Sequence, residues 1–264
     1  MTAGADEANA FMVRAADHLG SVRELVLSAS QSADENARRG MLVDLYCRIG
    51  SLGHFPDSAS LRPASQVAAA LEALLKKLLE HPRNSSPSTF QTLTTAVDLL
   101  RDLCVPGLRG DLATRPPVRL LVVDDDPIAR RTIAGGLQLG FGRPESAGDG
   151  ATALDLANEK SFDVIFMDVD MPGMDGFNAC ARIHQTALNR QTSVVFVTSH
   201  TDAETRRGAL QCGGSDFITK PFLCSELVLK ALTFTLRRRL DEPEPIQGEA
   251  SAIGTKDALL TTVR

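Results

Sequence analysis

The sequence predicts a protein in two parts, a helical bundle followed by a parallel α/β sheet. Before residue 105, apolar residues recur every three or four positions and no convincing strand occurs. After residue 118, short apolar runs without polar alternation end in polar side chains, which is typical of strands buried on both faces of a parallel sheet. A segment rich in proline and glycine separates the two patterns. We therefore expect domains at 1–105 and 118–240, a linker at 106–117 and a largely disordered tail at 241–264.

Four amphipathic helices are predicted in the first part. Loop-forming residues interrupt the apolar pattern at 28–34, 53–60 and 81–88. Short links between amphipathic helices favour an antiparallel four-helix bundle. The four apolar stripes are Phe11, Ala15, His18, Val22 and Leu25; Leu42, Leu45, Ile49 and Leu52; Val67, Leu71, Leu74, Leu75 and Leu78; and Phe90, Leu93, Val97, Leu100 and Cys104.

Polar side chains follow the predicted strands of the second part. Asp124 and Asp125 end the run LLVV, Asp168 ends VIFM, Thr198 ends SVVFV, and Lys220 follows the short run DFIT. Carboxyl ends of parallel strands meet at one edge of a sheet, where open α/β sheets bind their ligands. We therefore expect these five side chains to converge. The second strand, within 144–150, has the weakest pattern, and helices are expected at 127–139, 150–158, 176–186 and 202–212.

The chemistry of this set can be derived from its charges. Clustered carboxylates repel one another, and Mg²⁺, which takes few protein oxygen ligands beside water and phosphate, relieves the repulsion. A carboxylate beside the metal is then a plausible nucleophile toward phosphorus. The remaining phosphoryl oxygens need partners, which Lys220 and Thr198 supply. The product is an acyl phosphate on Asp168.

Residues 118–240 resemble the receiver domain of two-component response regulators, a five-stranded, doubly wound, flavodoxin-like fold. The resemblance rests on an acidic pair, a phosphoacceptor aspartate, a threonine and a Lys-Pro pair in the family's order. It implies that Asp168 is the phosphoacceptor and that Asp124, Asp125 and Asp168, with the backbone carbonyl of Asp170, hold Mg²⁺. It also implies a sensor histidine kinase or phosphorelay donor as partner.

The resemblance assigns roles to three further positions. Thr198 is the switch hydroxyl, Lys220 pairs with the phosphoryl group, and Phe217 takes the place of the switch aromatic residue. The family's Lys-Pro bond is usually cis, so we expect Lys220-Pro221 to be cis. A rival interpretation is the DxD motif of haloacid-dehalogenase-like phosphatases, but there the acid pair follows the nucleophile, whereas here it precedes it.

Two residues beyond the site are candidates for setting the phosphoryl lifetime. Asp170 lies two positions after Asp168, and His200 lies two positions after Thr198. Both would stand near the path of a water molecule attacking in line. The sequence does not determine whether they hinder or orient that water.

The helical half resembles a degenerate histidine phosphotransfer domain. The segment LYCRIGSLGHF occupies the place of the family's His-x-Leu-Lys-Gly signature, with Gly50 at the position of the phosphoacceptor histidine. His54 is the alternative acceptor, in which case the chain would be a phosphorelay phosphotransferase. Against this, His54 precedes Phe55-Pro56 and therefore lies near a helix end.

The last predicted helix carries more apolar surface than one sheet contact needs. Its apolar residues are Leu227, Leu232, Phe234 and Leu236, and Ser225 is a candidate N-cap. Three interpretations remain open. The helix packs on the sheet alone, it pairs with another subunit in a homodimer through helices four and five of the receiver, or it packs on the helical half. The basic cluster 237–239 is expected to neutralise its own helix end rather than bind phosphate backbone.

Composition excludes several functions. A net charge of −5, from 28 basic and 33 acidic residues, gives no general attraction to nucleic acid, so direct DNA binding is not expected. No apolar run approaches the roughly 20 residues that span a bilayer, and we expect a cytoplasmic protein without membrane contact. The five cysteines form no CxxC pair. We expect a signalling switch that acts through an unknown protein target, and not a turnover enzyme.

Overall fold

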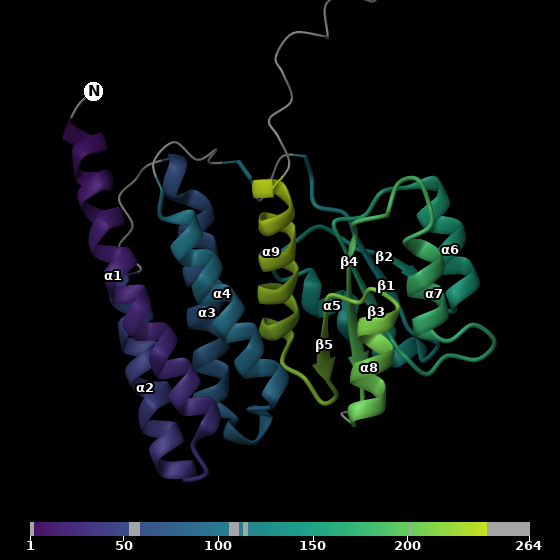
Figure 1. Ribbon diagram of the computed structural model, residues 1–264, viewed down its shortest axis with the longest axis horizontal. Helices are drawn as coiled ribbons and strands as arrows, with labels where there is room; N and C mark the ends of the chain where they lie inside the picture. Colours follow the sequence, from purple (N-terminus) through teal and green to yellow (C-terminus); the bar gives the residue numbers. More distant parts are fainter. Residues whose placement is uncertain (1–2, 53–58, 106–110, 113–115, 201, 242–264) are drawn as a thin grey trace, which may run out of the picture.

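The computed structural model describes residues 3–52, 59–105, 111–112, 116–200 and 202–241. Within them a helical bundle lies beside a three-layer α/β sandwich, and one long helix stands between the two (Figure 1). The predicted fold class is confirmed. His54, most of the predicted linker and the tail from residue 242 lie outside the described residues. None of the described helices has the length and apolar character needed to cross a membrane.

The bundle contains the four predicted helices, α1 (Ala3–Gln31), α2 (Glu35–Leu52), α3 (Arg62–Glu80) and α4 (Pro87–Leu103). Short 3-10 turns lie at Ala59–Leu61 and Pro82–Asn84. Helix α1 packs on α2 and α4, and α3 packs on the same two helices. The predicted stripes bury almost every apolar member, which makes hydrophobic burial the main force that holds the bundle together.

The N-terminus of α4 is fixed by a capping box. The Ser86 hydroxyl accepts a hydrogen bond from the Thr89 backbone N–H, while the Thr89 hydroxyl accepts one from the Ser86 N–H. This arrangement satisfies two of the backbone donors that a helix start leaves without partners. It also places Ser88 and Thr89 in the first turn, facing away from water, since both side chains are buried.

All five strands of the sheet are parallel, in the order β2-β1-β3-β4-β5. They are β1 (Leu120–Val123), β2 (Glu145–Ala147), β3 (Val164–Met167), β4 (Ser193–Thr198) and β5 (Asp216–Thr219). Helices α5 (Pro127–Leu137) and α9 (Cys224–Asp241) cover one face, and α6 (Gly150–Glu159) and α7 (Gly176–Ile183) cover the other. Helix α8 (Ala203–Gln211) follows β4. Both faces are therefore buried, as continuous apolar strands require.

Helix ends in the sheet domain are set mainly by aspartate caps and glycines. Asp126 caps α5 by accepting from the Ile128 N–H, and Gly213 follows the end of α8 with a φ of 86°. Helix α5 ends at Leu137, two residues before the predicted end, and α7 ends at Ile183, three residues before it. The predicted cap at Ser225 was wrong: α9 already begins at Cys224, and the Ser225 hydroxyl is buried without a hydrogen-bond partner.

Helix α9 has two apolar faces, and each belongs to a different core. Leu227 and Ala231 pack with α5 and the strands, whereas Leu229, Leu232 and Leu236 pack with the bundle. The excess apolar surface predicted for this helix is therefore used by contact with α3 and α4 (Figure 1). The bundle and the sheet share α9 as a common wall. The predicted homodimer through this helix stays a prediction, and the chain itself covers the outer face of α9.

The three arginines at the end of α9 bind other segments. Arg237 donates to the Thr95 carbonyl on α4, Arg238 to the Phe162 carbonyl, and Arg239 to the Leu112 carbonyl and the Asp163 carboxylate. They were expected to neutralise their own helix end. Instead, they tie that end to the bundle, to the segment before the sheet and to the segment before β3.

Candidate functional site

The register of the sheet brings the acidic residues together. Val123 pairs with Met167 on the neighbouring strand, so Asp124 and Asp168 follow adjacent strand ends at the carboxyl edge. Both carboxylates are largely buried, with 1% and 10% of their side-chain surface exposed, whereas Asp125 is exposed. Two buried acids side by side need a cation or a shared proton, because like charges at close range raise each other's energy.

Lys220 supplies the positive charge. Its Nζ lies 2.6 Å from Asp168 Oδ1 and 3.0 Å from Asp124 Oδ2. The lysine reaches this point from the end of β5, where its backbone N–H donates to the Thr198 carbonyl at 2.8 Å. The peptide bond between Lys220 and Pro221 is cis, which confirms the expectation from the sequence. Three predicted site residues from three strand ends thus form one hydrogen-bonded group.

Burial and charge act in opposite directions at this group. Burial raises the pKa of Asp168, and the ammonium of Lys220 opposes that rise without cancelling it. Burial alone would lower the pKa of Lys220, but its hydrogen bonds to Asp168 and Asp124 outweigh that effect and raise it. A lysine with a raised pKa stays charged at neutral pH and can neutralise anionic oxygens beside Asp168.

The loop after β3 shapes the site around Asp168. The Asp168 Oδ2 accepts from the Asp170 N–H at 3.0 Å, which fixes the carboxylate. Gly176 lies so close that a Cβ there would approach the Asp168 carbonyl oxygen to 2.1 Å. Only glycine allows this approach of the loop to the strand end.

Thr198 is the last residue of β4, and Phe217 lies within β5, three residues before Lys220. The Thr198 hydroxyl is buried and accepts from the His200 backbone N–H at 3.0 Å. Phe217 is half-buried, and the Arg206 guanidinium lies 5.3 Å from the centre of its ring. The structure therefore brings the threonine to the site edge with its hydroxyl engaged by its own loop.

Asp170 and His200, the two candidates for setting the phosphoryl lifetime, contact each other. His200 Nε2 lies 2.9 Å from Asp170 Oδ2, and both side chains are more than half exposed. An exposed pair of this kind contributes little to stability. It joins the loops after β3 and β4 at the edge where Asp168 lies.

Arg130 is a residue that the sequence reasoning missed. It lies on α5, and its Nη1 donates to the backbone carbonyls of Asp124 and Asp125. The guanidinium thus braces the loop that carries the acidic pair. In the sequence, only the position of Arg130 could have indicated this contact: it lies one turn into the helix that follows Asp124 and Asp125.

The donor set at the edge consists of hard oxygen ligands, as Mg²⁺ requires. Asp124 and Asp168 already share one ammonium, and Asp125 is adjacent in the chain. Among the described residues, however, no three acidic, histidine or cysteine side chains lie together in a group that could hold a metal. Mg²⁺ is usually held by a few carboxylate and carbonyl oxygens together with water, and not by a closed cage of side chains.

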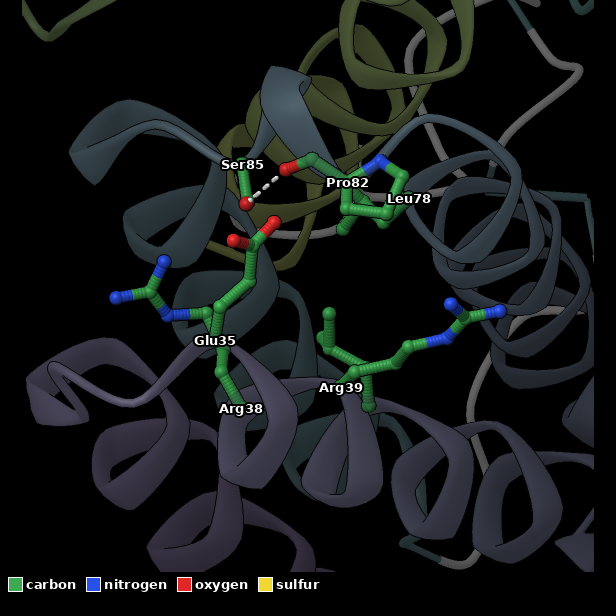
Figure 2. A pocket seen from close by; sticks show the side chains of 7 residues that line it. Glu35, Arg38, Arg39, Leu78, Pro82 and Ser85 are labelled. Atoms are coloured by element: carbon green, nitrogen blue, oxygen red, sulfur yellow. Dashed lines mark hydrogen bonds between the residues drawn. The ribbon is translucent and has the colours of Figure 1, made fainter.

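A separate pocket lies in the bundle, between α2, the end of α3 and the turn that follows it (Figure 2). Polar and apolar side chains line it, and the Ser85 hydroxyl beside it donates to the Pro82 carbonyl. None of the predicted site residues lines this pocket. Its lining residues are Glu35, Arg38, Arg39, Leu42, Leu78, Pro82 and Ser85.

Comparison with known proteins identifies the segment that carries this edge. The family model described as the response regulator receiver domain matches residues 120–232. The signal transduction histidine-protein kinase BarA of Shigella flexneri is 38% identical over 102 residues, which are 39% of this chain and 11% of that protein. The response regulator MprA of Mycolicibacterium vanbaalenii is 33% identical over 147 residues, 56% of this chain and 62% of that protein.

The chain thus spans less than two thirds of the length of these curated relatives. Among solved structures, the chemotaxis protein CheY4 of Vibrio cholerae is 32% identical, with 46% of this chain and 98% of that one covered and a TM-score of 0.42. The match to the family model coincides with the sheet and its acidic edge. Residues 120–232 of the chain are therefore a response regulator receiver domain.

Proposed function

We propose that the protein is a response regulator of two-component signalling that is phosphorylated on Asp168. The observation that carries the proposal is the Lys220 ammonium held between the carboxylates of Asp168 and Asp124 at the edge of the sheet. The receiver family and its relatives support the same role. They favour it over a phosphorelay phosphotransferase that uses His54, which lies outside the described residues.

The reaction needs little beyond positioning and charge balance. A carboxylate oxygen of Asp168 attacks the phosphorus of a phosphohistidine on a sensor kinase or phosphorelay donor. The P–N bond breaks, its electron pair stays on the imidazole nitrogen, and that nitrogen takes a proton. Lys220 then pairs with a phosphoryl oxygen instead of the bare carboxylate, and Thr198 donates its hydroxyl to another.

Magnesium completes this account. Asp124, Asp125, Asp168 and the Asp170 carbonyl are the groups that would hold Mg²⁺, and the bound ion would offset the negative charge of the entering phosphoryl group. Phosphorylation of Asp168 is the only reaction that we assign to the chain.

The signal leaves the receiver through protein contacts. Phosphorylation changes the equilibrium between two conformations only through contacts that differ between them, and here these are the contacts of Lys220, Thr198 and Phe217. With a net charge of −5 the chain has no electrostatic preference for DNA. The target is therefore a protein, or the helical bundle that packs on α9.

Beryllofluoride tests the phosphoacceptor. Together with Mg²⁺ it should bind the wild-type chain with a single resonance in ¹⁹F NMR and should not bind Asp168→Ala. Asp155→Asn, which changes an exposed carboxylate in the middle of α6, is the control and should keep binding. Equal binding by wild type and Asp168→Ala would refute the site. Acid-stable, base-labile labelling of the protein would confirm an acyl phosphate, and the reverse would indicate phosphohistidine.

The pair of Asp170 and His200 sets the phosphoryl lifetime in this proposal. The two side chains bridge the loops beside Asp168 at 2.9 Å, where they would limit or direct the approach of water. Replacing either with alanine should change the dephosphorylation rate, because each change opens the bridge while the Asp170 carbonyl is kept. Unchanged rates in both variants would remove this role.

A further inference from the structure

A buried polar cluster lies between the bundle and α9. The Glu226 carboxylate on α9 accepts hydrogen bonds from three hydroxyls of α4: Ser88 at 3.2 Å, Thr89 at 3.1 Å and Thr92 at 3.2 Å. All four side chains are at most 2% exposed. A buried carboxylate is costly unless it is fully hydrogen-bonded, so these hydroxyls hold the helices in one register.

Ser88 extends the cluster to the sheet. Its hydroxyl oxygen accepts from the Thr219 backbone N–H, with the two atoms 3.3 Å apart. Thr219 is the last residue of β5 and directly precedes Lys220. A side chain of the bundle is therefore bonded to the backbone that carries the lysine of the candidate phosphoryl site.

The next hydrogen bond reaches the second phosphoryl partner. The Lys220 N–H donates to the Thr198 carbonyl at 2.8 Å. The Thr198 hydroxyl accepts from the His200 N–H and has no hydrogen bond to Asp168 among those that the structure shows for the described residues. The hydroxyl is the acceptor in that bond, so its proton can be donated to a phosphoryl oxygen. If Thr198 moves toward the phosphoryl group, its carbonyl moves with it and shifts the end of β5, which Ser88 holds from the other side.

We propose that the Ser88 hydroxyl couples the bundle to the phosphoryl site by stabilising the strand end in its unphosphorylated position. This coupling rests on the proposed function of Asp168. Docking of the bundle and phosphorylation therefore oppose each other. The coupling free energy is reciprocal: Ser88 destabilises the phosphorylated state by the same amount as phosphorylation destabilises the docked bundle.

A titration of the full-length chain tests the coupling. The beryllofluoride concentration that half-saturates the ¹⁹F signal is measured with Mg²⁺ in wild type, Ser88→Ala and Thr94→Ala. Thr94 lies on the same helix, and its hydroxyl bonds to the Phe90 carbonyl of that helix. Ser88→Ala removes the hydrogen bonds to Glu226 and to the Thr219 N–H, and only the second holds the strand end. Loss of that one bond corresponds to about 3- to 10-fold in an equilibrium constant, so Ser88→Ala should half-saturate at a concentration lower by that factor. Thr94→Ala should stay within about twofold.

Hydrogen exchange tests the reverse direction without a variant of Ser88. Beryllofluoride should speed amide exchange at residues 88–92 and at Thr219 in the wild type, and leave it unchanged in Asp168→Ala. Unchanged or weaker beryllofluoride binding by Ser88→Ala, or unchanged exchange in the wild type, overturns the coupling. If the wild type itself does not bind beryllofluoride, the proposed function fails first, so the two failures are distinguishable.

Discussion

Replacing Leu229 with alanine should destabilise the bundle as well as the receiver. Leu229 is fully buried on the face of α9 that packs with the bundle. The change removes three carbons, or about 2.4 kcal/mol of transfer free energy at about 0.8 kcal/mol each. The cavity left behind brings the expected loss in the free energy of unfolding to about 2.5–5 kcal/mol. With a urea dependence of about 3 kcal/mol per molar, the midpoint falls by about 1 M.

The assay uses the single tyrosine of the chain. Tyr46 lies on α2, and the chain has no tryptophan, so tyrosine fluorescence reports on the bundle alone while far-UV circular dichroism reports on all helices. Both probes should shift together in Leu229→Ala. Leu210→Ala is the control, because it removes the same atoms from a side chain that is 77% exposed and should shift neither probe. A Tyr46 transition that stays at its wild-type midpoint would refute the conclusion that Leu229 on α9 is part of the core of the bundle.

Three further predictions concern charged residues. Burial raises the pKa of Glu226 above its ordinary value of 4.5. The contribution of Glu226 to the free energy of unfolding is therefore full below pH 4.5 and is lost as pH rises through the raised pKa. The stability of Glu226→Gln relative to wild type should therefore increase from pH 4.5 upward, by at most about 1.4 kcal/mol per pH unit in denaturant titrations. Lys220→Met leaves Asp124 and Asp168 without their cation and should lower the free energy of unfolding by about 1–3 kcal/mol, with recovery on adding Mg²⁺; no recovery would argue against the metal site. Arg239→Met breaks a buried ion pair and should cost about 3–5 kcal/mol in thermal or urea unfolding, and a loss below 1 kcal/mol would contradict its anchoring role.

The candidate site could be predicted because its chemistry is ordered along the chain. Asp124, Asp168, Thr198 and Lys220 each follow an apolar run, and a parallel sheet brings such ends to one edge. The bundle followed from four stripes at helical spacing. Helix ends were less accurate, since Ser225 has the residue type of a cap but lies one residue inside the helix.

The contact between the two halves could not be derived from the sequence. The pattern of α9 showed an excess of apolar surface but not which partner would cover it. Glu226 is an acidic residue in the first turn of a helix, where such residues are usually exposed, and Ser88 lies in a serine-rich segment typical of loops. Their burial depends on how two domains meet, which local spacing does not encode.

Because α9 packs against both the bundle and the sheet, the receiver cannot be moved to another protein without exposing one face of this helix. The family match ends at residue 232, in the middle of α9, whereas the helix continues to Asp241. A fragment cut at that boundary would lose Leu236 and leave Leu229 and Leu232 open to water. Such a fragment would tend to self-associate through the bared helix, so a dimer seen with the excised receiver would reflect the cut and not the intact chain.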